Sequence, residues 1–109
     1  MTTITIFTKP NHEYAGFVSM DHAGYADAGE DIVCAGISTL VINTVNSIES
    51  FTEDKFELVT NEEDGLISLT FKETPSHDSE LLMKSLVLGL QGIQNFYGNE
   101  YISLIFEEV

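Results

Sequence analysis

The alternation of apolar and polar residues in this chain predicts a series of short strands. Side chains of a strand point to opposite faces in turn, so β-branched and alternating runs are typical of strands. Such runs occupy residues 3–8, 14–20, 55–60, 66–72 and 101–107. The turn residues Lys9, Pro10 and Asn11 predict a hairpin between the first two strands. The pair Asp64 and Gly65 predicts a second hairpin, between the third and fourth.

Two longer stretches repeat their apolar residues every three or four positions, which is the spacing of one face of a helix. The first runs from residue 32 to about residue 48, with its apolar face at Val33, Ile37, Leu40/Val41, Val45 and Ile48. The second follows Ser76 and ends before Gly98, a residue suited to terminate a helix. Its apolar face consists of Leu82, Leu86, Leu90, Ile93 and Tyr97.

The order of these elements is ββαββαβ, which predicts an α+β sandwich. We expect both long helices to pack on one face of a mainly antiparallel sheet, because amphipathic helices gain most of their stability by burying their apolar face. A length of 109 residues without repeats or linkers predicts a single domain over residues 1–109.

The charge of the chain narrows its possible partners. Four Lys and Arg against eighteen Asp and Glu give a net charge of −14. Such a surface disfavours direct binding to nucleic acid or to an anionic membrane and favours a basic partner. The apolar runs are short, and the N-terminus lacks the pattern of a secretory signal. We therefore expect a cytoplasmic protein that is not membrane-bound.

Candidate chemistry centres on Cys34, the only cysteine. A single cysteine excludes an internal disulfide and a multi-cysteine metal cage. A zinc site from His22, Cys34 and a carboxylate is possible by residue type, but no pair of ligands has the spacing of a zinc site, so we predict no metal and no cofactor. If Asp31 is the N-cap of the first helix, Cys34 lies in the first turn. Unpaired N–H groups there would favour a thiolate and could hydrogen-bond an oxyanion on a substrate carbonyl. Alternatively, Cys34 is a small buried hydrophobic residue.

A loop predicted over residues 21–31 joins the second strand to the first helix and contains His22. With Gly24 and Gly29 as hinges, it could bring the imidazole to the sulfur, which gives the minimum set of groups for a cysteine-based acyl transferase or hydrolase. Asp31 could orient His22 instead of capping the helix. His22 could equally be an ordinary loop residue, and the glycines ordinary turn residues.

Two further residues are candidates for a substrate pocket. Ser38 lies one helical turn after Cys34, and Tyr25 could supply an aromatic wall from the loop. Alternatively, Ser38 faces solvent or hydrogen-bonds to the helix backbone, and Tyr25 packs against the protein.

Residues 22–35 resemble the signature of the ribosomal-processing cysteine protease family, Prp. The matching residues are His22-Ala23-Gly24-Tyr25 and Gly29-Glu30-Asp31-Ile32-Val33-Cys34-Ala35. The element order and the length agree as well. The family usually has Gly before the His, whereas this chain has Asp21, which restricts the backbone and adds charge.

The resemblance implies a cytoplasmic endopeptidase that removes an N-terminal extension from large-subunit ribosomal protein number twenty-seven during ribosome maturation. By position, Cys34 is then the nucleophile, and His22 is the general base and later the acid for the leaving amine. The resemblance also implies a homodimer. The alternative hypothesis is a non-catalytic, acidic, dimeric adaptor or chaperone for a basic ribosomal protein, in which Cys34 only fills the core.

Overall fold

The computed structural model describes residues 1–21 and 28–109, with side chains described for 1–21 and 32–109. Within these residues the predicted order ββαββαβ is confirmed. The elements are β1 (Thr2–Thr8), β2 (Tyr14–Asp21), α1 (Ala28–Phe51), β3 (Phe56–Asn61), β4 (Leu66–Phe71), α2 (His77–Tyr97) and β5 (Ile102–Glu108).

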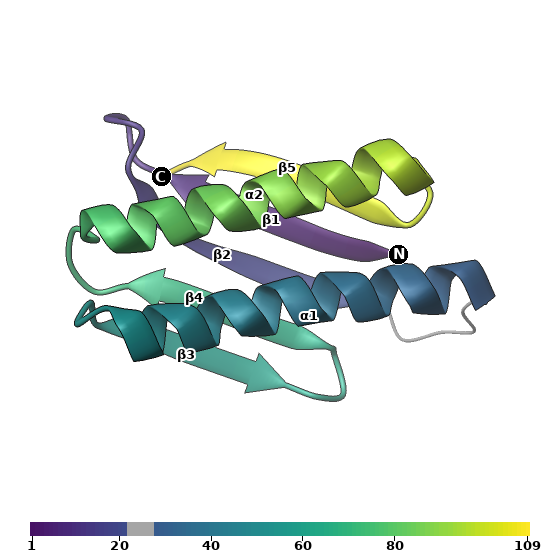
Figure 1. Cartoon of the computed structure of the whole chain (residues 1–109), viewed down its shortest axis with the longest axis horizontal. Helices are drawn as coiled ribbons and strands as arrows, with labels where there is room; N and C mark the ends of the chain where they lie inside the picture. Colours follow the sequence, from purple (N-terminus) through teal and green to yellow (C-terminus); the bar gives the residue numbers. More distant parts are fainter. Residues whose placement is uncertain (22–27) are drawn as a thin grey trace.

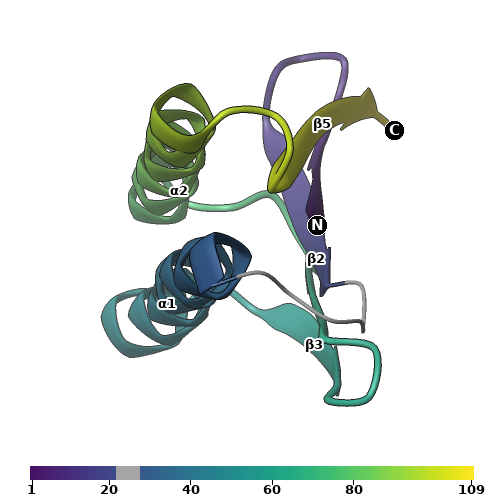
Figure 2. The same ribbon diagram turned by 90° about the vertical axis from the view of Figure 1, so that its right-hand side faces the viewer.

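The strands form a mixed, mostly antiparallel sheet in the order β3-β4-β2-β1-β5 (Figure 1). Both predicted hairpins are present, since β1 pairs with β2 and β3 pairs with β4 in antiparallel fashion. β5 joins the edge beside β1 and runs parallel to it. Both helices lie on the same face of the sheet, α1 toward the β3 side and α2 toward the β5 side (Figure 2).

The core fills the space between the helices and this face of the sheet. The apolar face predicted for the first helix is confirmed, because its members are buried at Val33, Ile37, Val41, Val45 and Ile48. α2 contributes Met83, Leu86, Val87 and Leu90, and the sheet contributes Ile4, Ile6, Phe17, Leu69, Phe71 and Ile102. Tyr97 departs from the prediction. It is the last residue of α2 and 42% exposed, and its ring packs edge-to-face on Phe96.

Residues 32–51 of α1 are long and apolar enough to cross a membrane by length and composition alone. In the fold this segment supplies the central stripe of the core, from Val33 to Ile48. Packing against the sheet therefore accounts for the apolar residues of this stripe.

The first helix begins earlier than the sequence predicted. α1 starts at Ala28 rather than at residue 32, so Asp31 lies inside the helix and is not its N-cap. Gly29, predicted as a loop hinge, is likewise a helical residue. Acidic residues are favoured in the first turn of a helix as well as at its cap, so the cluster at Glu30 and Asp31 is compatible with either start.

The second helix has the predicted limits and is tied to the end of the first by hydrogen bonds. The N-cap is Ser76, whose hydroxyl accepts from the Ser79 N–H at 3.3 Å, and Gly98 ends the helix with φ of +89°. Asp54, just after α1, accepts from the Ser76 N–H at 3.0 Å, from the Ser76 hydroxyl at 2.5 Å and from the Ser79 hydroxyl.

Candidate functional site

Cys34 lies where α1 passes the start of β1. It is the seventh residue of α1, which places it in the second turn rather than the first turn expected. The N–H groups without intrahelical partners are those of residues 28–31, so the helix end is one turn from the sulfur. Cys34 is partly exposed, between buried Val33 and exposed Ala35, and forms no disulfide. It is therefore not a fully buried core residue.

The sulfur has a polar neighbour that the sequence did not reveal. The Thr2 hydroxyl lies 3.4 Å from Cys34 Sγ and also donates a hydrogen bond to Asp21 Oδ1. Thr2 begins β1 and Asp21 ends β2, and the two are paired across the antiparallel ladder. Thr2 is only 1% exposed. The cluster thus joins β1, β2 and α1 at one point, and only knowledge of the strand register could have predicted it.

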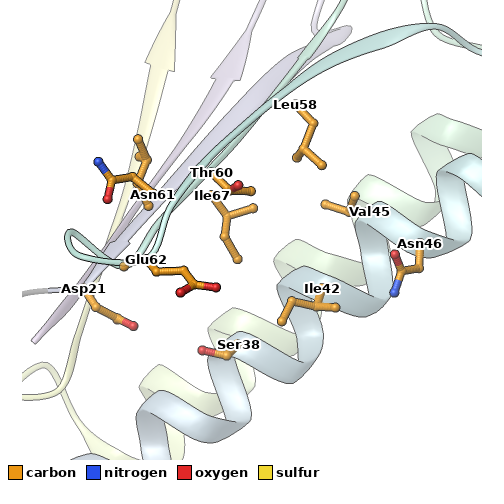
Figure 3. Close-up of a pocket in the computed structure, with 12 residues that line it drawn as sticks. Asp21, Ser38, Ile42, Val45, Asn46, Leu58, Thr60, Asn61, Glu62 and Ile67 are labelled. Atoms are coloured by element: carbon orange, nitrogen blue, oxygen red, sulfur yellow. The ribbon is translucent and has the colours of Figure 1, made fainter.

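A pocket of about 460 Å³ opens between α1 and the β3–β4 hairpin (Figure 3). Its apolar wall includes Ile42 and Val45 from α1 and Leu58 and Ile67 from the hairpin. Its polar members are Asp21, Ser38, Asn46, Thr60, Asn61 and Glu62. Ser38 stands one helical turn from Cys34, and Asp21 bonds to the Thr2 hydroxyl beside the sulfur. The pocket and Cys34 are therefore neighbours.

The remaining predicted site residues have different outcomes. His22, Gly24 and Tyr25 lie outside the residues that the structure describes, so their roles stay predictions. Asp31 is placed only by the backbone of α1, and its role in orienting His22 stays a prediction too. Ser38 lines the pocket, and its contact with a substrate stays a prediction.

Among the side chains of residues 1–21 and 32–109, no group of three His, Cys, Asp or Glu residues is arranged to hold a metal ion. The absence of a metal and of a cofactor remains a prediction, because the side chains of residues 22–31 are not among those that the structure describes.

These observations define an α+β protein with a partly exposed cysteine beside a pocket. A family model described as "Cysteine protease Prp" matches residues 1–103, nearly the whole chain. The chain therefore belongs to the Prp family of ribosomal-processing cysteine proteases, and it is a peptidase of the cysteine class. The resemblance noted in residues 22–35 is confirmed at the level of the family.

The individual relatives are distant in sequence but similar throughout their length. The ribosomal processing cysteine protease Prp of Staphylococcus aureus (strain Mu50 / ATCC 700699) is 26% identical over 107 residues, which is 98% of this chain and all of the relative. The structure of S. aureus Prp with a substrate peptide has a TM-score of 0.91 at 25% identity, over 98% of this chain and 100% of the other. The S. aureus structure with a covalently linked product peptide has a TM-score of 0.87 at 26% identity, with the same coverage.

Proposed function

We propose that this protein removes the N-terminal extension of large-subunit ribosomal protein number twenty-seven in a bacterium whose gene encodes that extension. The observation that supports this most strongly is the near full-length match to the Prp family, together with a partly exposed Cys34 within the segment that resembles the family's signature. The relatives are described as ribosomal processing proteases, and a ribosomal protein is basic, which suits a partner of net charge −14.

In the proposed reaction the Cys34 sulfur attacks the scissile carbonyl carbon while the thiol proton passes to the imidazole of His22. The tetrahedral intermediate collapses, the C–N bond breaks, and the same proton leaves with the amine. A water molecule then attacks the thioester carbonyl carbon while His22 accepts its proton. The C–S bond breaks, the acyl fragment leaves as a carboxylic acid, and His22 returns the proton to the sulfur, which restores the thiol. A covalent intermediate agrees with the S. aureus structure that holds a covalently linked product peptide.

The pocket is the proposed site for the side chains that select the bond. Ile42, Val45 and Leu58 offer an apolar surface, and a volume of about 460 Å³ is enough for a large apolar side chain. Asp21 and Glu62 at its polar side would attract a cationic residue of the same peptide. Charge alone does not choose one bond among many, so we assign selectivity to the apolar wall and attraction to the carboxylates.

We also propose that the enzyme acts in the cytoplasm as a homodimer, with no metal or cofactor. The resemblance to Prp supports the dimer, and substrate processing during ribosome maturation supports the location. Analytical ultracentrifugation of the purified chain tests the dimer. A sedimentation coefficient of a 12.1 kDa monomer at all concentrations would contradict it.

The function is tested by incubating the extended ribosomal protein with wild type, Cys34→Ala and His22→Ala. We expect wild type to release the extension at one bond and both variants to bind without cutting. Binding without cleavage by wild type would leave the non-catalytic adaptor as the function. Cleavage by both variants would show that the assigned residues are wrong.

The pocket is tested by filling it. Ser38→Phe places a ring in the pocket, and we expect the KM for the extended substrate to rise at least about tenfold. Thr39→Phe is the matched control, because Thr39 is exposed, adjacent in sequence and outside the pocket. Equal KM values for the two variants would show that the substrate does not enter the pocket.

A further inference from the structure

The Thr2 hydroxyl lies between the Cys34 sulfur and the Asp21 carboxylate, and it can donate its single proton to only one of them. A carboxylate only accepts hydrogen bonds, so the Thr2 proton points to Asp21 Oδ1. Toward Cys34 Sγ, 3.4 Å away, the hydroxyl therefore presents a lone pair. A thiol S–H can donate to that lone pair, whereas a thiolate would face it with negative charge.

The backbones of Thr2 and Asp21, the two residues that this hydrogen bond joins, are both held by further contacts. Thr2 is 1% exposed, and its backbone N–H donates to the Tyr101 carbonyl at 3.0 Å. The Asp21 N–H donates to the Gly65 carbonyl at 3.3 Å in the turn between β3 and β4. A Cβ at Gly65, where φ is +59°, would lie 2.7 Å from Asp21 Cβ, so glycine allows this close approach. The pairing of β1 with β2 and the contact of β2 with the β3–β4 turn thus hold the Thr2 hydroxyl against Asp21.

We propose that Thr2 is a positioning residue, oriented by Asp21, that keeps the Cys34 side chain in its protonated thiol form in the resting protein. When the Thr2 hydroxyl turns from Asp21 to the sulfur, the hydrogen bond to Asp21 breaks, a hydrogen bond to the sulfur forms, and the thiolate that remains after the thiol proton passes to His22 is stabilised. Because Asp21 also lines the pocket, one hydroxyl connects the pocket with the sulfur. The inference rests on the proposed role of Cys34 as nucleophile.

The test measures the alkylation rate of the full-length protein by iodoacetamide as a function of pH, without substrate. Cys34 is the only cysteine, so the adduct reports on it alone. Thr2→Val is nearly isosteric and removes the hydroxyl. We expect its alkylation at pH 7 to be about fivefold faster than wild type, the factor that corresponds to about 1 kcal/mol for one hydrogen bond.

Matched variants separate this role from a structural one. Thr2→Ser keeps the hydroxyl and is expected to react at the wild-type rate. Thr5→Val makes the same substitution further along β1, at a position that alternates to the other face, and is expected to change nothing. A Thr2→Val rate at or below that of wild type would overturn the proposal, because the hydroxyl would then assist the thiolate. A faster rate for Thr2→Val together with a wild-type rate for Thr2→Ser would support the proposal.

The part of Asp21 is tested by Asp21→Asn in two backgrounds. The amide can donate to the Thr2 oxygen, which lets the hydroxyl turn to the sulfur, so alkylation should accelerate. In the Thr2→Val background the same substitution should have no effect, since Asp21 acts through the hydroxyl. An equal acceleration in both backgrounds would show that Asp21 acts by its charge alone and would overturn the proposal that it acts through the Thr2 hydroxyl. Because no substrate is present, these results stand or fall separately from the cleavage assay.

Discussion

The hydrogen bonds on Asp54 connect the end of α1 to the start of α2, and we expect Asp54→Asn to weaken this connection measurably. Three donors converge on Asp54 Oδ2: the Ser76 N–H, the Ser76 hydroxyl and the Ser79 hydroxyl. Asparagine keeps the shape and one oxygen acceptor but removes the charge. The substitution therefore isolates what the carboxylate adds to the contact between the two helices.

The size of the effect follows from the number of bonds and their exposure. A hydrogen bond contributes about 1 kcal/mol, and a charged acceptor about doubles it. Asparagine removes the part of each hydrogen bond that the charge adds, about 1 kcal/mol, which makes about 3 kcal/mol for the three bonds. Because Asp54 is partly exposed, solvent screening roughly halves this loss. We expect the free energy of unfolding at pH 7 to fall by about 1.5 kcal/mol. Glu53→Gln, an exposed neighbour, is the control and should change it by less than about 0.5 kcal/mol.

The pH dependence identifies the cause. Partial burial would raise the pKa of Asp54, but the hydrogen bonds from Ser76 and Ser79 outweigh it and hold the pKa below its ordinary value of 3.8. A folded-state pKa that is lowered contributes stability above the unfolded value, and this stability is lost as the pH falls through the folded value. Urea unfolding should therefore show a wide gap between wild type and Asp54→Asn at neutral pH that narrows below about pH 4. An unchanged gap at acidic pH would show that the charge of Asp54 is not the cause.

Three further predictions concern the core and the sheet. Ile37→Ala should lower the free energy of unfolding by about 3 kcal/mol in urea titrations, whereas Ile32→Ala, at a 63% exposed position of the same helix, should change it by less than about 1 kcal/mol. Gly16→Ala should prevent folding or cost at least about 3 kcal/mol by circular dichroism, because the new Cβ would lie 2.1 Å from a carbonyl oxygen of β4. Burial, and secondly the charge of Glu80, raise the pKa of Tyr14, so Glu80→Gln should lower that pKa while leaving it above 10.0 in an NMR titration.

The local elements could be predicted because their signals are local. The alternation in the strands, the turn at Asp64 and Gly65, and the spacing from Val33 to Ile48 each depend on a short window of sequence, and each is present in the fold. The position of β5 beside β1, parallel to it, could not be predicted in this way. Its pairing joins the two ends of the chain, and no short-range pattern encodes such a register.

In the candidate site, too, the residues with a local sequence signal could be predicted and the others could not. Cys34 stood out by its residue type and by the signature around it, and Ser38 by its spacing from Cys34. Thr2 did not, because a threonine at the start of a strand has no chemical signal until the register places it against Asp21. The start of α1 was predicted too late because acidic residues suit both the cap and the first turn of a helix.

The proposed function depends most on Cys34 being the nucleophile of a ribosomal-protein protease. The most direct measurement is mass spectrometry of the extended large-subunit ribosomal protein number twenty-seven after incubation with wild type and with Cys34→Ala. We expect two fragments from a single cut with wild type and an intact, bound protein with Cys34→Ala. An intact protein with wild type, or the same fragments with Cys34→Ala, would contradict the proposed function.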